Sequence, residues 1–242
     1  AEYVDGVFTT NAIRLTDYDA APGAADGVFG NVIAQNSFEL RAESFSQMPG
    51  CEVFANGVFY SVGAGDNLFE GNVFDSEARS DDAYSYGAYI GASHNGGVWR
   101  DNTFRTNDKA VWFSSAYGPA ANARFAGNTF ERTANAFYTP AAPDAAFRLG
   151  YCCGYEASAL DLLDNTWSGG FDRDAFWFTS NQPAPYSFAF RWTVTVTARS
   201  GGLPVADALV TLAGAGESAT GRTDADGRVE LEATEYRQSG TN

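Results

Sequence analysis

The side chains best suited to acid–base chemistry in this 242-residue chain lie in one short stretch. They are Asp81, Asp82, His94, Asp108 and Lys109. Carboxylate, imidazole and amine groups act as general acids or bases when their surroundings adjust their pKa values. If the segments that carry them stack as neighbouring strands, about 4.8 Å apart, these groups come within reach of one another. The alternative, which we favour, is that they are solvated turn residues on an acidic protein.

Large aromatic side chains recur at one position of a repeated segment and offer a second kind of site. The segment begins with a small residue, as in Gly57-Val58-Phe59-Tyr60 and Ala136-Phe137-Tyr138-Thr139. If it forms a strand, its second and fourth residues point inward and its third points outward, because side chains alternate between faces. The outward position holds, in chain order, Arg14, Phe59, Tyr89, Trp112, Tyr138 and Trp177.

We therefore predict a column of aromatic rings on one outer sheet. An open column would suit sugar rings, whose C–H faces pack on aromatic faces, and the ligand-binding residues would be the five listed rings. An open column would equally suit a protein partner or a second copy of the chain. In the third alternative, the insertions at residues 16–31 or 140–159, or the C-terminal part, cover the rings.

A second phrase alternates with the first and predicts how the column is positioned. It has an Asn with an apolar residue three places before it and an aromatic residue two places after it. The asparagines are Asn36, Asn72, Asn102, Asn128 and Asn165. Asn tolerates left-handed backbone and bonds to its own neighbours, so we place it at the bend after a strand. Fixed phrases at irregular spacing are typical of a solenoid, and stacked repeats would align these side chains in an amide ladder.

The alternation of the two phrases from Ala12 to Phe178 closely resembles the right-handed parallel β-helix repeat of pectin-lyase-like proteins. The resemblance implies an all-β chain with a right-handed parallel β-helix over residues 1–182. That family includes polysaccharide lyases and hydrolases, epimerases, phage tailspikes, adhesins and surface proteins, so the fold does not select a function. By the same resemblance, a lyase would use Lys109 as its base, and a hydrolase would use clustered Asp residues.

The composition favours a secreted or cell-surface protein that does not bind nucleic acid. The chain has 30 acidic and 15 basic residues, a formal charge of −15, and Lys109 is its one lysine. Such a composition is typical of proteins that work in high salt, or of a GC-rich genome. It disfavours nucleic acid and anionic membranes, and an anionic polysaccharide would need a local basic patch or bridging cations. No apolar run is long enough to form a transmembrane segment.

The three cysteines leave several pairings open. Cys51 could bond to Cys152 or Cys153, or the adjacent pair could form a vicinal disulfide. Together with His94 they lack the paired spacing of zinc sites, so we predict no metal site there.

The character of the chain changes after Asn181. Residues 192–197 alternate as a strand, and two later segments resemble the carboxypeptidase regulatory-like domain and bacterial Ig-like repeats. That resemblance implies a β-sandwich module over residues 188–242, incomplete because few residues follow Leu231. Asp224 and Asp226 make calcium possible, but Arg228 occupies the next ligand position, and we favour a hairpin turn.

Three functional hypotheses follow. The first is a binding or structural unit directed toward carbohydrate, and the second is a polysaccharide lyase or hydrolase. The third is a self-assembling extracellular fibre or surface-layer component, because the short stretch before Ala12 leaves little room for a cap on the first coil.

Overall fold

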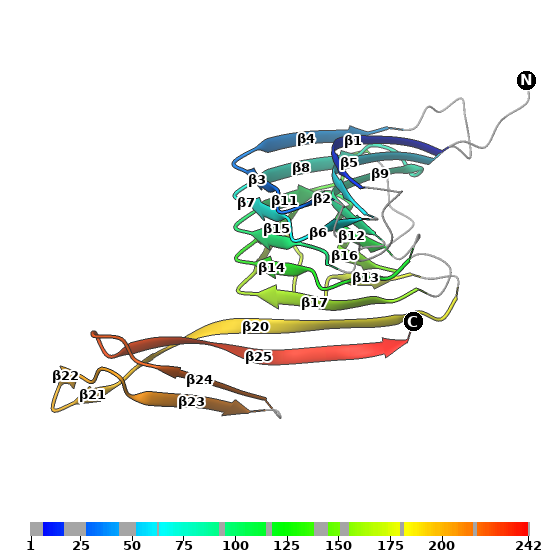
Figure 1. Ribbon diagram of the computed structural model, residues 1–242. Coiled ribbons are helices and arrows are strands. Elements are labelled where there is room, and N and C mark those ends of the chain that lie inside the picture. Colours follow the sequence, from blue (N-terminus) through cyan, green and yellow to red (C-terminus); the bar gives the residue numbers. More distant parts are fainter. Residues whose placement is uncertain are drawn as a thin grey trace, which may run out of the picture.

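The computed structural model describes residues 7–16, 28–43, 52–61, 63–91, 95–114, 118–137, 145–150, 155–179, 182–214 and 217–241 (Figure 1). Within these ranges the chain is all-β, and its regular elements are strands. None of the described segments forms a helix of the length and hydrophobicity that crossing a membrane requires.

Three sheets organise the chain, and successive strands visit them in turn (Figure 1). The six-stranded sheet has the order β1 (Val7–Leu15), β5 (Glu52–Tyr60), β9 (Ala83–Gly91), β12 (Lys109–Ser114), β16 (Ala145–Leu149) and β19 (Phe176–Phe178). The five-stranded sheet has the order β4 (Ser37–Ala42), β8 (Val73–Ala78), β11 (Thr103–Thr106), β15 (Thr129–Arg132) and β18 (Thr166–Ser168). The eight-stranded sheet runs through β3 (Val32–Ala34), β7 (Leu68–Glu70), β10 (Val98–Arg100), β14 (Arg124–Ala126), β17 (Ala157–Leu163), β20 (Pro185–Thr197) and β25 (Arg228–Thr241), with β13 (Ala120–Ala121) on β17.

Each strand pairs in parallel with its counterpart in the next repeat. Thus β10, β11 and β12 pair with β7, β8 and β9. The short strands β2 (Val28–Phe29) and β6 (Ala64–Gly65) also pair in parallel. The expectation of an all-β chain built from parallel sheets is confirmed.

The core between the sheets is a set of stacked aromatic rings. Phe38, Phe74, Phe104, Phe130 and Trp167 occupy one position of five consecutive strands, and their ring centroids are 4.9, 4.9, 5.2 and 4.9 Å apart. The spacing matches the distance between paired strands, so the rings follow the backbone register. Phe69, Trp99 and Phe125 form a second stack and are fully buried. Because burial of each such side chain contributes about 1.5–3 kcal/mol, these stacks dominate the stability of the repeats.

The predicted asparagine ladder is confirmed. Each Asn donates its side-chain amide and its backbone N–H to Oδ1 of the next, as Asn72 does to Asn102 at 3.0 and 2.9 Å. The same amide also donates to a backbone carbonyl of the previous repeat, as Asn102 does to Phe69 at 2.9 Å. The contacts continue through Asn36, Asn72, Asn102, Asn128 and Asn165.

One detail of the ladder differs from our expectation. The left-handed residue is the one before each Asn and not the Asn itself. These residues are Gln35, Gly71, Asp101, Gly127 and Asp164, with φ of 58°, 62°, 56°, 65° and 51°. The bend therefore precedes the Asn, whose side chain then fills the corner and satisfies the backbone groups that the bend exposes.

The repeated segments that carry the outer column begin with a small residue, and this residue marks a bend in the strands of the six-stranded sheet. A Cβ on Gly57 would lie 2.6 Å from the Gly87 carbonyl oxygen and 2.7 Å from the Phe74 ring, so Gly57 faces the core. The next residue, Val58, is also in the core, so two successive residues face inward. In β16, Ala146 and Phe147 do the same. A small residue is required here because the backbone passes directly over the core rings.

One repeat is formed by a different segment from the one expected. We predicted a strand over residues 136–139 with Phe137 inward, but Phe137 is 48% exposed. The strand that pairs with β12 is β16, whose Phe147 lies in register with Val111. The prediction that Phe137 faces inward is therefore wrong, and Ala145–Leu149 pairs with β12, while residues 138 and 139 lie outside the described ranges.

The C-terminal region shares a strand with the parallel sheets. β20 pairs in parallel with β17 and, along its whole length, antiparallel with β25. β23 (Leu209–Gly214) and β24 (Glu217–Arg222) form an antiparallel hairpin beside them, and β21 (Arg199–Ser200) pairs with β22 (Leu203–Pro204) (Figure 1). The boundary that we predicted between residues 182 and 188 thus falls at the start of a strand that belongs to both parts.

The segment from Asp224 to Gly227 forms a tight turn, in which the Gly227 backbone N–H donates to the Asp224 carbonyl at 3.0 Å, but the strands on either side pair with other strands, β24 with β23 and β25 with β20. The Asp224 carboxylate accepts hydrogen bonds from the backbone N–H groups of Asp226 and Arg228, each at 2.9 Å. Gly227 has φ of 74°, which Gly adopts without strain. Within the described ranges, no group of three or more His, Cys, Asp or Glu side chains is placed to hold a metal ion.

The ladder predicts a graded loss of stability. Asn102→Leu removes the acceptor of two buried donors of Asn72, so it should lower the free energy of unfolding by about 1–3 kcal/mol. Asn36→Leu at the exposed end of the ladder is the matched control and should cost less, because water replaces its contacts. Urea denaturation measures both, and equal effects would contradict the ladder.

The bend predicts that position 57 does not tolerate even the methyl group of alanine. Gly57→Ala should destabilise the protein by about 1–3 kcal/mol, because the Cβ would clash with both the Gly87 carbonyl oxygen and the Phe74 ring. Gly214→Ala serves as control, since no heavy atom lies within 4 Å of a Cβ placed there. Thermal melting that is unchanged by Gly57→Ala would count against this account of the bend.

Candidate functional site

The outer column of the six-stranded sheet has the predicted register over most of its length. Arg14 pairs with Phe59, Phe59 with Tyr89, and Tyr89 with Trp112. The next two positions are Arg148 and Trp177. Arg148 therefore occupies the position that we assigned to Tyr138, which lies outside the described residues.

Three rings of this column are buried, as in the alternative in which other parts of the chain cover the column. Phe59, Tyr89 and Trp112 are 9%, 6% and 4% exposed. They belong to a second apolar cluster on the outside of the sheet, which also contains Phe54, Tyr84 and Tyr86. We call these six residues the outer aromatic cluster. Ligand binding by Phe59, Tyr89, Trp112, Tyr138 and Trp177 stays a prediction.

The bend at Gly57 explains part of this burial. Upstream of the bend the alternation is shifted by one residue, so Val53 and Ala55 face inward and Phe54 faces outward. The Phe54 ring then lies 6.1 Å from Trp112 and 4.9 Å from Tyr84, between centroids. Phe54 and Tyr84 are partly exposed, and Tyr86 and Trp112 are buried. The outer aromatic cluster therefore has a half-exposed rim and a buried floor.

Two cationic side chains lie against these rings. The Arg148 guanidinium carbon is 4.1 Å from the Trp112 ring centroid and 4.7 Å from that of Trp177. Arg148 Nη1 also donates a hydrogen bond of 2.9 Å to the Tyr86 hydroxyl. Lys109 Nζ lies 4.9 Å from the Trp177 centroid and forms an ion pair with Asp108. Cation–π contacts of this kind are strongest where water is excluded, as it is here.

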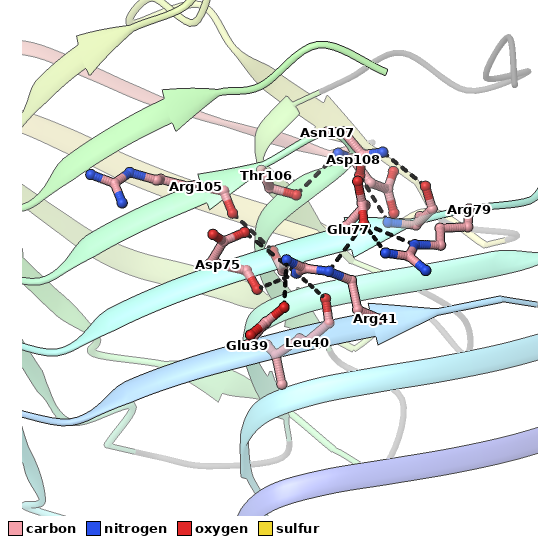
Figure 2. A network of polar contacts seen from close by, with 12 residues as sticks. Glu39, Leu40, Arg41, Asp75, Glu77, Arg79, Arg105, Thr106, Asn107 and Asp108 are labelled. Carbon is pink, nitrogen blue, oxygen red and sulfur yellow. Dashed lines mark hydrogen bonds and ion pairs between the residues drawn. The ribbon is translucent and has the colours of Figure 1, made fainter. Parts of the chain in front are cut away.

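The corner between β11 and β12 positions Asp108 and Lys109. The Thr106 hydroxyl accepts a hydrogen bond of 3.0 Å from the Asp108 backbone N–H, and the Asn107 amide pairs with both backbone groups of Ala78 at 2.8 Å (Figure 2). On the neighbouring strands of the five-stranded sheet, Arg41 of β4 forms ion pairs with Glu39 of β4 and with Asp75 and Glu77 of β8, at 3.1, 3.4 and 3.0 Å (Figure 2). The exposed charges are thus paired outside, and Asp108 and Lys109 are buried inside.

The two tyrosines remain neutral at physiological pH. Burial strongly raises the pKa of Tyr86. Burial also raises the pKa of Tyr84, and the charge of Glu52 raises it further. Each phenol therefore offers a hydroxyl that can donate and accept hydrogen bonds beside the Arg148 guanidinium.

The structure brings together only some of the predicted acid–base residues. Asp108 and Lys109 contact each other at the start of β12. Asp81 and Asp82 are exposed in the turn before β9, and Asp82 reaches the site only through its charge, which contributes to the raised pKa of Tyr84. His94, Cys51, Cys152 and Cys153 lie outside the described residues.

Arg148 was not predicted from the sequence, although a signal was present. Ala146-Phe147-Arg148-Leu149 repeats Ala12-Ile13-Arg14-Leu15 almost letter for letter. The two arginines occupy the same column of the sheet. Tyr86 and Phe54 were missed because a strict alternation does not foresee the shift at the bend.

No family model, curated protein or solved structure matches this chain. Its function has to be inferred from its own residues and their geometry.

The buried floor predicts that Trp112 has a structural role. Trp112→Ala should reduce the free energy of unfolding by about 3–5 kcal/mol, because it leaves a cavity and removes the partner of the Arg148 guanidinium. Trp192→Ala, at an exposed position of β20, should change it by about 0.5 kcal/mol. Chemical denaturation compares the two, and similar small effects would show that Trp112 is not part of a packed cluster.

Proposed function

We propose that the chain is a secreted or cell-surface protein that binds carbohydrate, with the right-handed parallel β-helix fold of pectin-lyase-like proteins over residues 1–182. The fold proposal is supported by the three parallel sheets, which successive strands visit in turn, and by the asparagine ladder at one corner. We further propose that the C-terminal strands form a β-sandwich module that acts as a spacer.

The placement of Arg148 is the observation that supports the binding proposal. Its guanidinium lies between two tryptophan rings and donates to a tyrosine hydroxyl. Sugar sites combine aromatic faces for the C–H surface of the ring with a few oriented polar groups. The outer face of the six-stranded sheet offers this combination.

The charge of the site favours a sugar with an acidic group. The chain as a whole has a formal charge of −15, which repels polyanions. The outer face of the six-stranded sheet is different, because the Arg148 guanidinium lies there against the rings of Trp112 and Trp177. A planar guanidinium matches a carboxylate in a two-point contact. We propose Arg148 as the local basic group that an anionic polysaccharide requires.

The half-exposed rings are the surface that a sugar would contact. Phe54 and Tyr84 are stacked at 4.9 Å with an angle of 18° between their planes, and Trp177 is partly exposed at the other end. The buried rings beneath fix their orientation. We propose that sugar units lie along this rim, with the acidic group directed toward Arg148.

A polysaccharide lyase is the second candidate, and the position of Lys109 favours it. An amine, a guanidinium and two phenol hydroxyls on one face are the groups that abstract a proton from a uronate and neutralise its carboxylate. Against this, Lys109 is buried and its amine is engaged by Asp108. Binding without turnover is therefore our primary proposal.

Trp177 provides the test of the binding proposal. Isothermal titration should show that the protein binds polygalacturonate and does not bind neutral dextran of equal length. Trp177→Ala should weaken binding by at least about tenfold, because it removes an exposed face and loosens both cations. Tyr236→Ala on β25, also a half-exposed ring, is the control and should bind as the native protein does.

Equal binding of the two polymers, or equal affinity of the two variants, would contradict this proposal. The same samples test the lyase alternative through the ultraviolet absorbance of unsaturated products. If the protein forms these products and Lys109→Ala abolishes their formation, the function is catalysis and not binding alone.

A further inference from the structure

A depression on the outer face of the eight-stranded sheet is built like a ligand site, and it lies on a different sheet from the outer aromatic cluster. Its volume is about 370 Å³, and its polar lining comes from Asp161, Ser187, Arg191 and Arg237. It forms because one outward position is small. Ala189 lies in register between Asp161 on β17 and Arg237 on β25, so two long side chains flank a methyl group.

The backbone beside the depression is irregular. The pairing of β17 with β20 shifts register between Ala157 and Leu160. Ala159, at the shift, has φ of 54°, a left-handed conformation that costs a non-glycine residue free energy. Its N–H donates to the Ser187 hydroxyl at 2.8 Å, and the Ser187 hydroxyl hydrogen remains available to a further acceptor. Bulges of this kind are concentrated beside functional sites, where they redirect side chains.

The charged groups around the depression are held by ion pairs, including one of 3.6 Å between Arg191 Nη1 and Asp161 Oδ2. Arg191 donates to Glu232 at 3.1 Å, and Arg237 forms an ion pair with Glu217. Arg124 Nη1 bonds to Asp161 Oδ2 at 3.0 Å. These contacts fix the side chains in place before any ligand arrives, which lowers the entropy cost of binding.

Two polar atoms at this place are unsatisfied. Asp161 Oδ1 and Arg191 Nε are shielded from water, and neither has a hydrogen-bond partner in the structure. Such groups are uncommon in folded proteins and call for an explanation. The carboxylate torsion of Asp is broad, so Oδ1 can change its direction at little cost. Desolvation raises the pKa of Asp161, which agrees with a carboxylate that is short of donors.

We propose that this depression binds a small hydroxy-carboxylate of the size of one sugar acid. The ligand carboxylate would accept hydrogen bonds from Arg191, Arg237 and the Ser187 hydroxyl. A neighbouring ligand hydroxyl would donate to Asp161 Oδ1. The volume suits a single ring and not a chain of rings, because pockets for larger ligands extend to about 1,000 Å³. The ligand is therefore a free sugar acid or the end unit of an acidic polysaccharide.

The test uses the whole chain and three probes, namely glucuronate, glucose and acetate. Titration followed by NMR should show binding of glucuronate that is at least about tenfold tighter than that of glucose or acetate, because only glucuronate has both the acid and the hydroxyl. Ala189→Leu fills the depression and leaves every charge in place, so it should abolish binding. Arg237→Gln should weaken binding by at least about tenfold, since a neutral amide cannot pair with the ligand carboxylate.

Two further variants separate this site from the one proposed above. Arg105→Gln removes a similar exposed ion pair, with Glu131, and should bind glucuronate normally. Trp177→Ala disrupts the site proposed on the six-stranded sheet, but the NMR shifts of Ser187 and Ala189 on addition of glucuronate should persist in it, because Trp177 lies on a different sheet. Absence of glucuronate binding, equal binding of acetate, or loss of binding in Trp177→Ala but not in Ala189→Leu would each overturn the proposal. Competition with an oligogalacturonate distinguishes the two sources of the ligand. If the oligomer displaces glucuronate, the depression accepts the end unit of a polysaccharide. If it does not, the ligand is the free acid.

Discussion

The backbone at each buried corner must find hydrogen-bond partners, and the rest of the structure depends on how it does so. A left-handed residue turns the chain, and the Asn that follows bonds to the repeats on either side. Because each Oδ1 accepts from a fixed backbone N–H, adjacent repeats have one register. That register places Phe over Phe in the core and one outward residue over the next on the outer face. The columns that could bind ligands are therefore a consequence of corner hydrogen bonding.

The sequence alone was sufficient for features that repeat with a constant phase. The Asn phrase and the alternation of the strands predicted the parallel sheets, the amide ladder and most of the outer column. It was insufficient where the phase changes. At Gly57 two successive residues face the core, and this shift places the Phe54 ring beside Trp112 on the outer face, a neighbour that strict alternation does not predict. We assigned the segment that contains Arg148 to an insertion. Residues 136–139 come earlier in the chain, directly after the Asn128 phrase, so we placed the strand there although they fit the phrase less closely.

The depression at Ala189 could not be predicted from the sequence for a different reason. Its residues come from β17, β20 and β25, and nothing in their local pattern relates Asp161 to Arg237. Their proximity follows from an antiparallel strand added to a parallel sheet, together with a register shift beside it. Pairings between segments so far apart in the sequence are set by the tertiary structure. By contrast, the turn at Asp224 depends on neighbours within four residues, and the sequence was enough to favour it.

The shared strand β20 has a mechanical consequence. It pairs with β17 on one side and with β25 along its whole length on the other, and it continues from the stacked repeats into the C-terminal region. A pull directed along β20 loads these backbone hydrogen bonds in shear, so they resist together and do not open one after another. A tether attached through the C-terminal region would thus transmit tension into the sheet without first detaching its last strand. A linker of irregular chain at the same place would extend before the repeats experienced any load.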